Sequence, residues 1–493
     1  MKLINQWPSA CDCIVLGIDE NGTLAAPAAD LSPDLTDFLV AAWKAGCVSA
    51  KRFDPSLVPL PEPAAYESAL LVGLGNAGDL SVGDAFQIGA TALRALTKNP
   101  GKRLAVGFVS LWGDAGQAAL VAGALHGTEG QAIRKSQPER FPPETLAFPG
   151  INSAVLERGR IVGNAVNRTR DLVNQPANDL FPESFAQWAA KVASEQGLQV
   201  EIWDQDRLVA ERCQAILAVG QGSANPPRLV KLSHRGGDPQ QPPVVFVGKG
   251  ITFDTGGYSL KPTDSMLDMK CDMAGAATVV GVMQAIAELK LPCNVEGILA
   301  LAENMIDGNS YRLGDVITTR SGKTVEIHNT DAEGRVVLAD ALDVALQSKP
   351  AAIVDLATLT GACVVALGTE ISGLMGNDRA LQAEIQAAAD SQGEWVWPLP
   401  MHSFFDDQVK GKIADLKNVG EGRWGGATTA AKFLEAFVGQ VPWLHIDIAG
   451  PAFASNATPQ RDAGGTGAMV RTLTHWLQSR EMPSRPNVAD PPS

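Results

Sequence analysis

The chain has 493 residues, of which 45% are hydrophobic and 19% are charged, and its formal net charge is −14. This length is too great for one ordinary hydrophobic core, so it predicts two domains. The acidic balance argues against a protein that binds nucleic acid over its whole surface, because phosphate contacts need lysine and arginine. A local basic patch is still compatible with it.

The sequence carries no pattern typical of export or membrane insertion. Met1–Cys11 lacks the apolar run of a signal peptide, and no stretch of about 18 apolar residues suggests a membrane span. Seven scattered cysteines are typical of free thiols in a reducing compartment, so we expect a cytoplasmic location. Cys11 and Cys13 could form half of a metal site, but Cys13–Leu16 is better interpreted as a buried strand.

Residues 1–150 predict a small α/β domain. Short apolar runs suited to strands occur at Cys13–Leu16, Ala69–Val72 and Leu104–Phe108, and Asp84–Leu96 has apolar residues at helical spacing. Gly73–Gly78 matches the G-x-G-x-x-G pattern of dinucleotide-binding loops. That function would require an acidic residue at the end of the next strand, which is missing, so we interpret the glycines as a strand-to-helix turn.

A helix is predicted to connect two domains. Gln137–Pro149 is rich in proline and charge and is the candidate linker. Residues 154–173 then show helical periodicity, with Ser153 as the expected N-cap, so we assign 151–174 to a connecting helix. Residues 175–480 form the predicted larger domain. Residues 481–493 contain four prolines and few apolar residues, which predicts a disordered tail.

Strands and helices alternate in the larger domain. The predicted strands are Gln199–Trp203, Arg228–Leu232, Val244–Val247, Val295–Leu301, Thr324–Ile327, Ala352–Asp355 and Leu444–Ile448. The predicted helices include Pro182–Gln196, Ala274–Leu289, Gly334–Gln347, Leu381–Ser391 and Thr428–Val438. This alternation predicts an α/β fold with a mostly parallel central sheet flanked by helices. Ligands bind beyond the carboxyl ends of the strands in such sheets.

Four carboxylates lie in glycine-rich sequence next to these predicted strands, namely Asp254, Asp272, Asp331 and Glu333. Acidic residues in turns are common, so each one alone could be an ordinary surface residue. Gathered at one place, they would repel each other unless cations neutralised them, and hard cations take oxygen ligands. Together they could supply ligands for two divalent ions.

Several motifs in this region resemble the leucyl aminopeptidase family, the dinuclear-metal cytosolic aminopeptidases. The matching segments, which follow the family's order, are Gly248-Lys249-Gly250, Thr252–Gly257, Ser259–Pro262, Asp272–Ala277 and Asn329–Arg335. The likeness runs from about Arg168 to about Thr474 and is weaker before residue 150. The resemblance implies an N-terminal α/β cap domain, a C-terminal catalytic domain and assembly into a homohexamer.

The resemblance also implies the roles of individual residues. Two divalent ions would be bound by Lys249, Asp254, Asp272, Asp331 and Glu333. Lys261 would hold the substrate carbonyl oxygen as it becomes an oxyanion, and Arg335 would hold a bicarbonate ion that shuttles a proton. Without the motifs, either cation would be interpreted as a surface ion pair. Mn²⁺ or Zn²⁺ is the expected metal, with Mg²⁺ or Co²⁺ as alternatives. The sequence alone does not decide between these four.

The implied reaction removes the N-terminal residue of a peptide. Both ions would activate a bridging water, and one would take the free α-amine, which an internal peptide bond lacks. Met269, Thr358 and Gly361 match the family's side-chain pocket, so leucine and other apolar residues are the expected preference. Thr255, Tyr258 and His328 depart from the family's commoner residues, and Tyr258 and His328 bear on fine specificity.

Two other functions are compatible with the sequence. Some members of this family also bind DNA as regulators, but the net charge makes nucleic acid an unfavourable partner here. A metal-dependent phosphoester hydrolase would use a similar set of ions and carboxylates. A serine hydrolase is less consistent, because no G-x-S-x-G motif is present.

Overall fold

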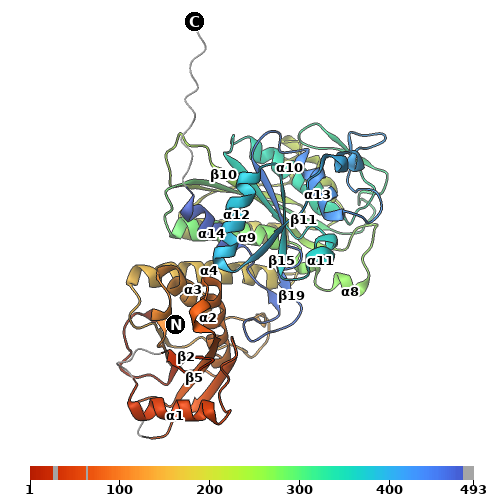
Figure 1. Ribbon diagram of the computed structural model, residues 1–493. Coiled ribbons are helices and arrows are strands. Elements are labelled where there is room, and N and C mark those ends of the chain that lie inside the picture. The colour runs from red at the N-terminus through yellow and green to blue at the C-terminus, as the bar shows by residue number, and fades with distance from the viewer. Residues whose placement is uncertain (26–30, 63–64, 481–493) are drawn as a thin grey trace. The chain divides into compact units, whose positions relative to one another are not determined.

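The structure, a computed structural model, describes residues 1–25, 31–62 and 65–480. The chain divides into two compact units (Figure 1). The first comprises Met1–Asn167, Ser391–Gly393 and Ala454–Thr466, and the second comprises the remaining residues from Arg168 onward. The predicted tail, 481–493, lies outside the described residues. No described helix has both the length and the apolar character that a membrane crossing requires.

The first unit is built on a seven-stranded sheet with the order β1-β7-β6-β2-β5-β4, in which β3 pairs with β2. Its strands are β1 Lys2–Ile4, β2 Cys13–Asp19, β3 Leu24–Ala25, β4 Pro55–Pro59, β5 Ser68–Gly75, β6 Arg103–Val106 and β7 Thr145–Ala147. Three of these strands, β2, β5 and β6, coincide with the predicted apolar runs. The linker prediction for Gln137–Pro149 is wrong in part, because β7 lies within it and pairs with β1 and β6.

Helices cover both faces of this sheet (Figure 1). They are α1 Pro33–Lys44, α2 Val82–Leu96 and α3 Asp114–His126. Side chains alternate along β2, so Val15 packs with residues of α2 and α3, and Ile14 packs with Leu39 of α1. Helix α2 begins only after Ser81, which caps it, and Gly75 has a φ of 63°. This geometry confirms the interpretation of the glycine motif as a turn and that of Cys13–Leu16 as a strand.

The connecting segment is a long helix, α4 Ser153–Asn174. Its N-cap is Asn152 rather than the expected Ser153, because Asn152 Oδ1 accepts a hydrogen bond from the Ala154 N–H at 2.8 Å. The change from the first unit to the second lies within this helix, between Asn167 and Arg168. The predicted domain boundaries, which place the end of the first domain at residue 150, the end of the connecting helix at 174 and the end of the larger domain at 480, stay a prediction.

The second unit contains an eight-stranded sheet with the order β16-β15-β18-β14-β10-β11-β9-β8. Its strands are β8 Gln199–Trp203, β9 Arg228–Arg235, β10 Val244–Asp254, β11 Asn294–Asn304, β14 Ala352–Ala357, β15 Ile371–Gly376, β16 Trp395–Pro398 and β18 Trp443–Asp447. The four central strands β11, β10, β14 and β18 are parallel. The antiparallel pairs lie outside them, where β9 joins β11, β8 joins β9 and β15 joins β18.

Helices lie on both faces of this sheet (Figure 1), and each face packs a hydrophobic core. One face packs against α5 Pro182–Gln196, α9 Ala274–Glu288, α12 Arg379–Gln392 and α14 Val470–Ser479. The other face packs against α6 Gln205–Ala210, α7 Gln214–Gly220, α10 Glu333–Leu346 and α13 Gly426–Glu435. Along β10, Phe246 belongs to the first core, whereas Val245 and Val247 belong to the second. The predicted α/β fold is therefore confirmed.

One predicted strand lies outside the central sheet. Only Thr324–Glu326 of the predicted Thr324–Ile327 is extended, and this strand, β13, belongs to a small sheet with β12 Val316–Thr318 and β17 Leu416–Lys417. The reason is a hairpin: Gly322, with a φ of 87°, lets the chain turn between β12 and β13, which pair antiparallel. Short elements complete the unit at α8 Thr263–Met266, α11 Gly361–Leu367, β19 Phe453–Ala454 and β20 Gly464–Gly465.

Helix α9 approaches the central sheet unusually closely because its second residue is Gly275. A Cβ at this position would overlap the carbonyl oxygen of Leu356 on β14 and would lie 3.1 Å from the backbone nitrogen of Lys249 on β10. Asp272 precedes α9 by two residues. The glycine therefore fixes how near Asp272 comes to the end of β10.

We expect Gly275→Ala to destabilise the second unit, because the added methyl group must push α9 away from backbone atoms that cannot yield. Overpacking of this kind costs about 1–3 kcal/mol. The midpoint of chemical denaturation should fall. Gly308→Ala is the matched control, since a Cβ there meets no atom within 4 Å. Equal midpoints for the two variants would contradict the proposed role of this contact.

Candidate metal centre

A cavity of about 610 Å³ opens beyond the carboxyl ends of the central strands. All ten residues that the sequence predicts as site residues line it: Lys249, Asp254, Lys261, Met269, Asp272, Asp331, Glu333, Arg335, Thr358 and Gly361. A cavity of this size can hold a small organic molecule or a short peptide. The structure therefore brings together residues from five separate segments of the second unit.

Strand β10 delivers the first two polar side chains. Lys249 follows the apolar positions Val245 and Val247 on the same face of the strand, and Asp254 ends the strand after an irregularity in its pairing with β11. Lys249 is buried, and its Nζ lies 2.8 Å from Asp272 Oδ1 and 2.8 Å from Glu333 Oε1. It also donates a hydrogen bond of 3.0 Å to the carbonyl of Thr358.

Helix α10 can pass close to the Lys249 side chain because Gly334 has no Cβ. A Cβ at this position would lie 2.6 Å from Lys249 Cε. Since Glu333 is the first residue of α10, the same approach places its carboxylate against the lysine. A glycine next to Glu333 is thus a geometric requirement of the ion pair.

Three acidic side chains form a compact group of oxygen atoms. One ligand atom each from Asp254, Asp272 and Glu333 lies within 4.8 Å of the others, and all three residues are buried. Asp272 Oδ2 and Glu333 Oε2 are buried and find no hydrogen-bond partner in the described part of the chain. Buried carboxylate oxygens are rarely left without a partner. A donor set of this kind fits divalent cations.

Lys261 lies beside this group rather than within it. Its Nζ is 2.9 Å from Asp254 Oδ2 and 2.6 Å from Asp331 Oδ1. Lys261 follows the loop at Gly256–Gly257, and the Lys261 N–H donates to the Thr255 carbonyl at 2.9 Å. The ammonium group is therefore held at the wall of the cavity by two carboxylates.

The Arg335 guanidinium is buried in the first turn of α10. Its Nη1 donates a hydrogen bond of 2.9 Å to the Asn418 carbonyl. Its Nε is buried and has no hydrogen-bond partner within the described residues. The planar group thus keeps donor capacity for an anion with two oxygens.

Two walls of the cavity are less polar. Met269 opens a short 3₁₀ turn, Met269–Cys271, and Gly361 begins α11, where a Cβ would meet no atom within 4 Å. Thr358 Oγ1 donates a hydrogen bond of 2.7 Å to Asp272 Oδ1, so the hydroxyl of this threonine faces the acidic group. Further apolar residues line the same space, including Leu359, Ala362, Val364, Val419 and Ala449.

Burial and charge together shape the proton affinities of the site. Burial raises the pKa of Asp254 to about 6, and the neighbouring Glu333 carboxylate adds to the rise. Burial alone would lower the pKa of Lys249, but the Asp272 and Glu333 carboxylates outweigh it and raise that pKa. Burial lowers the pKa of Arg335 to about 10. The acidic group therefore attracts positive charge strongly.

Two unusual residues lie elsewhere. The Tyr258 hydroxyl donates to the Asp307 carbonyl at 3.2 Å, and His328 Nε2 lies 2.8 Å from Glu326 Oε2. Neither is among the described residues that line the cavity.

Comparison with known proteins gives the family. The model of the cytosol aminopeptidase family catalytic domain matches residues 167–474, and that of the family's N-terminal domain matches residues 15–137. The chain belongs to the cytosol aminopeptidase family. It is a metal-dependent aminopeptidase, and the predicted recognition and enzyme class are confirmed.

Individual relatives agree with this assignment. A probable cytosol aminopeptidase of Rhodopirellula baltica is 57% identical over 410 residues, which are 83% of this chain and 81% of the relative. Among solved structures, the bottromycin maturation enzyme BotP in complex with Mn has a TM-score of 0.85 at 34% identity, covering 95% of this chain and 99% of that one. A tomato leucine aminopeptidase mutant has a TM-score of 0.85 at 30% identity, covering 97% of each chain.

The sequence did not identify the amide side chains that support the aminopeptidase site. Asn304, the last residue of β11, donates from Nδ2 to Asp254 Oδ1 at 2.8 Å and to the Thr330 carbonyl at 3.0 Å. Thr330 Oγ1 in turn donates to the Gly256 carbonyl at 2.7 Å. These bonds join the loop after Asp254 to the loop before Asp331. The position of Asn304 at the carboxyl end of a parallel strand was the one available signal.

Asn418 is a second supporting residue and is fully buried. Its Oδ1 accepts from the His328 N–H at 2.8 Å and its Nδ2 donates to the Asn329 carbonyl at 2.6 Å. Its own carbonyl accepts from Arg335. This one residue therefore positions both the Asn329–Glu333 loop and the guanidinium.

We expect Asn418→Ala to lower both stability and turnover of the aminopeptidase. It leaves partly buried backbone groups of the 328–329 loop without their amide partner, and an unpaired group costs about 1–3 kcal/mol when it is fully buried and less when water reaches it. Denaturation midpoints and kcat on an aminoacyl amide would measure the effect. Asn309→Ala, at an exposed position outside the cavity, is the control. A variant with unchanged midpoint and unchanged kcat would mean that the main chain alone holds the loop.

Proposed function

We propose that this aminopeptidase releases N-terminal residues, preferably leucine and other apolar residues, from peptides with the help of two bound divalent ions. The observation that carries the proposal is the buried group of Asp254, Asp272 and Glu333, whose ligand atoms lie within 4.8 Å of one another. Two of their oxygens have no hydrogen-bond partner among the described residues. The match to the cytosol aminopeptidase catalytic domain supports the same reaction.

Five residues would hold the ions: Lys249, Asp254, Asp272, Asp331 and Glu333. When bound, the ions would supply an activated water and would polarise the scissile carbonyl. The oxygen-rich donor set suits Mn²⁺ or Mg²⁺ by hardness, whereas Zn²⁺ or Co²⁺ fits by the order of metal affinities. Mn²⁺ and Zn²⁺ are the metals we expect first. The manganese of the BotP complex belongs to that enzyme and supports manganese as the first metal to try here.

Lys249 is the unusual member of this set, because a lysine nitrogen is a ligand only when it is neutral. Burial favours the neutral amine, and neighbouring divalent ions would favour it further. When protonated, the same nitrogen is a counter-ion for Asp272 and Glu333, both 2.8 Å away. Its position among the carboxylates suits it for either form.

Lys261 and Arg335 would act on the substrate side. The Lys261 ammonium, held by Asp254 and Asp331 at the wall of the cavity, can donate to a carbonyl oxygen as negative charge develops on it. Arg335 can hold bicarbonate with its fork of N–H groups, and a bicarbonate oxygen there could accept a proton from water. The Asn418 carbonyl fixes the orientation of the guanidinium for this task.

The pocket for the side chain of the released N-terminal residue would include Met269, Thr358 and Gly361. Gly361 leaves space, and Met269 is a flexible apolar side chain that can adapt to several shapes. A bound ion would take the neutral α-amine of the peptide, which an internal peptide bond lacks. This combination would favour N-terminal residues with apolar side chains.

We extend the proposal to the whole chain from the family resemblance. We propose a homohexamer in the cytoplasm, with a cap domain at 1–150, a connecting helix at 151–174 and a catalytic domain at 175–480. The curated relatives bear the name cytosol aminopeptidase, which supports the location.

Metal removal tests the central proposal. A chelator should abolish hydrolysis of an aminoacyl amide, and Mn²⁺ or Zn²⁺ should restore it, since the acidic group needs cations to work. Asp272→Ala and Glu333→Ala should each lose bound metal together with turnover. Asp206→Ala, at an exposed acid outside the cavity, should lose neither. Full activity of the chelated enzyme would refute the metal centre, and faster cleavage of a phosphoester would point to the alternative hydrolase.

The two lysines should behave differently when removed. Lys261→Ala should keep its metal but lose roughly 10²-fold or more in kcat, because its proposed contact forms only in the transition state. Lys249→Ala should lose metal, as expected for a ligand. Metal analysis and steady-state kinetics on both variants would measure the contrast. A Lys261→Ala enzyme with raised KM and normal kcat would assign that lysine to substrate binding instead.

A further inference from the structure

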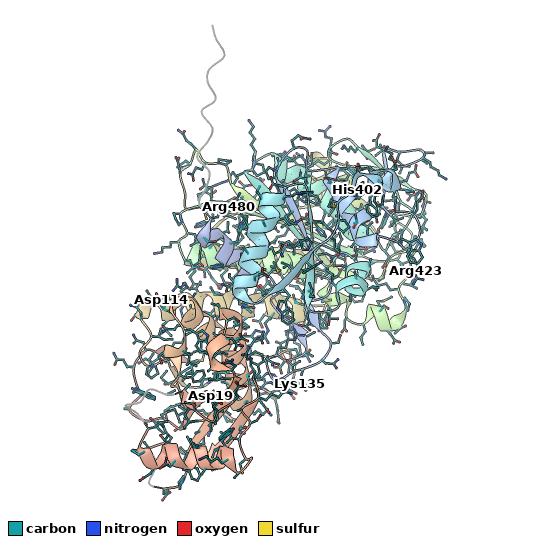
Figure 2. All side chains as sticks on the ribbon, in the orientation of Figure 1. Asp19, Asp114, Lys135, His402, Arg423 and Arg480 are labelled. Carbon is teal, nitrogen blue, oxygen red and sulfur yellow. The ribbon has the colours of Figure 1, made fainter. Side chains whose placement is uncertain are left out.

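The loop between β17 and α13 forms one wall of the aminopeptidase cavity. Val419 and Arg423 line the cavity from this loop, and Gly426, the first residue of α13, lines it directly after the loop. Glycines at 422 and 425, with φ values of 63° and 62°, bend the chain on either side of Arg423 and Trp424. Figure 2 labels Arg423 at the outer edge of the second unit, on the side where Figure 1 places α8. Pro262 and Ser265 from that side line the same cavity.

The Arg423 side chain differs from the other basic side chains of the cavity. Lys249 and Lys261 each contact two carboxylates. Arg335 is buried and donates to a backbone carbonyl. Arg423 is exposed, and its guanidinium lies over the Trp424 ring at 5.8 Å but makes no ion pair or hydrogen bond within the described residues. It is therefore a cation at the cavity wall whose donors are available.

We propose that Arg423 binds the C-terminal carboxylate of short peptide substrates, so that this enzyme favours di- and tripeptides with a free carboxyl end. The inference rests on the proposed function. A bound ion would take the α-amine at one end of such a peptide, and Arg423 offers an anion site elsewhere on the same cavity wall. The cavity volume of about 610 Å³ is sufficient for a short peptide.

The chemistry of arginine suits this task. Its planar fork presents two parallel N–H groups to a carboxylate, and a charged pair of this kind is stronger than a neutral hydrogen bond. Contact with the Trp424 ring restricts the guanidinium. A cation on this wall would also favour short peptides over long ones, because the carboxylate of a long peptide would lie beyond the reach of the loop.

The test compares two substrates that differ at the carboxyl end, Leu-Gly and its C-terminal amide. The full-length, metal-loaded enzyme should show a kcat/KM at least about tenfold higher for Leu-Gly, because the charged hydrogen bonds are absent with the amide. Arg423→Gln should lower this ratio of kcat/KM values about tenfold, and Arg423→Lys should retain part of it. The two substrates also differ in their leaving groups, but this difference affects the ratio of kcat/KM values equally in every variant and so cancels when variants are compared. Arg379→Gln, at an exposed arginine outside the cavity, is the matched control and should keep the wild-type ratio.

The outcomes separate this inference from the proposed function. An Arg423→Gln enzyme that keeps the wild-type ratio would overturn the role of Arg423, as would a wild-type enzyme without any preference for the free carboxylate. In both cases chelator-sensitive hydrolysis of leucine p-nitroanilide would leave the proposed function standing. An enzyme that hydrolyses none of these substrates in the presence of metal would overturn both.

Discussion

The rest of the structure depends on one constraint, which is that three carboxylates must lie close together in a buried site. Asp254, Asp272 and Glu333 are each almost fully removed from solvent, where an unpaired carboxylate is costly. Lys249 offsets part of this cost through two contacts of 2.8 Å. The arrangement retains buried oxygens without partners among the described residues, so its chemistry is that of a receptor for cations rather than that of a closed salt bridge.

The rest of the second unit can be understood as the means of holding that charge. The parallel strands end at one edge of the sheet, which directs Lys249 and Asp254 to a common point. Gly275 and Gly334 let two helices approach this point closely enough for Asp272 and Glu333 to reach the lysine. The two hydrophobic cores on the faces of the sheet stabilise the folded unit, and this stabilisation offsets the free-energy cost of burying the carboxylates.

The sequence predicts the regular parts of this architecture well, for reasons visible in particular elements. The predicted bounds of α5 and β8 agree with the structure, because Pro182 suits the first turn of a helix and Gly197 adopts the left-handed conformation that ends one. Lys249 and Asp254 could be placed because they lie at the carboxyl end of a central strand, and Thr358 and Gly361 because they follow another. Asn304 and Asn418 could not be found in this way, since their partners lie far away in sequence and are mostly backbone groups. Strand β13 was predicted to join the central sheet because a run of four mostly β-branched residues carries no information about which strand it pairs with.

The small sheet of β12, β13 and β17 has a consequence for how the enzyme loses activity. Its strands have two or three residues each, yet the loop with Asp331 and Glu333 follows β13, and Asn418 follows β17. Opening free energies differ between the parts of a protein, and short strands with few buried groups open at the lower end of the range. Partial opening of this sheet would release the loop while both large cores stay folded. The enzyme is therefore expected to become inactive on warming before its helices melt, with a heat tolerance set by this three-stranded sheet.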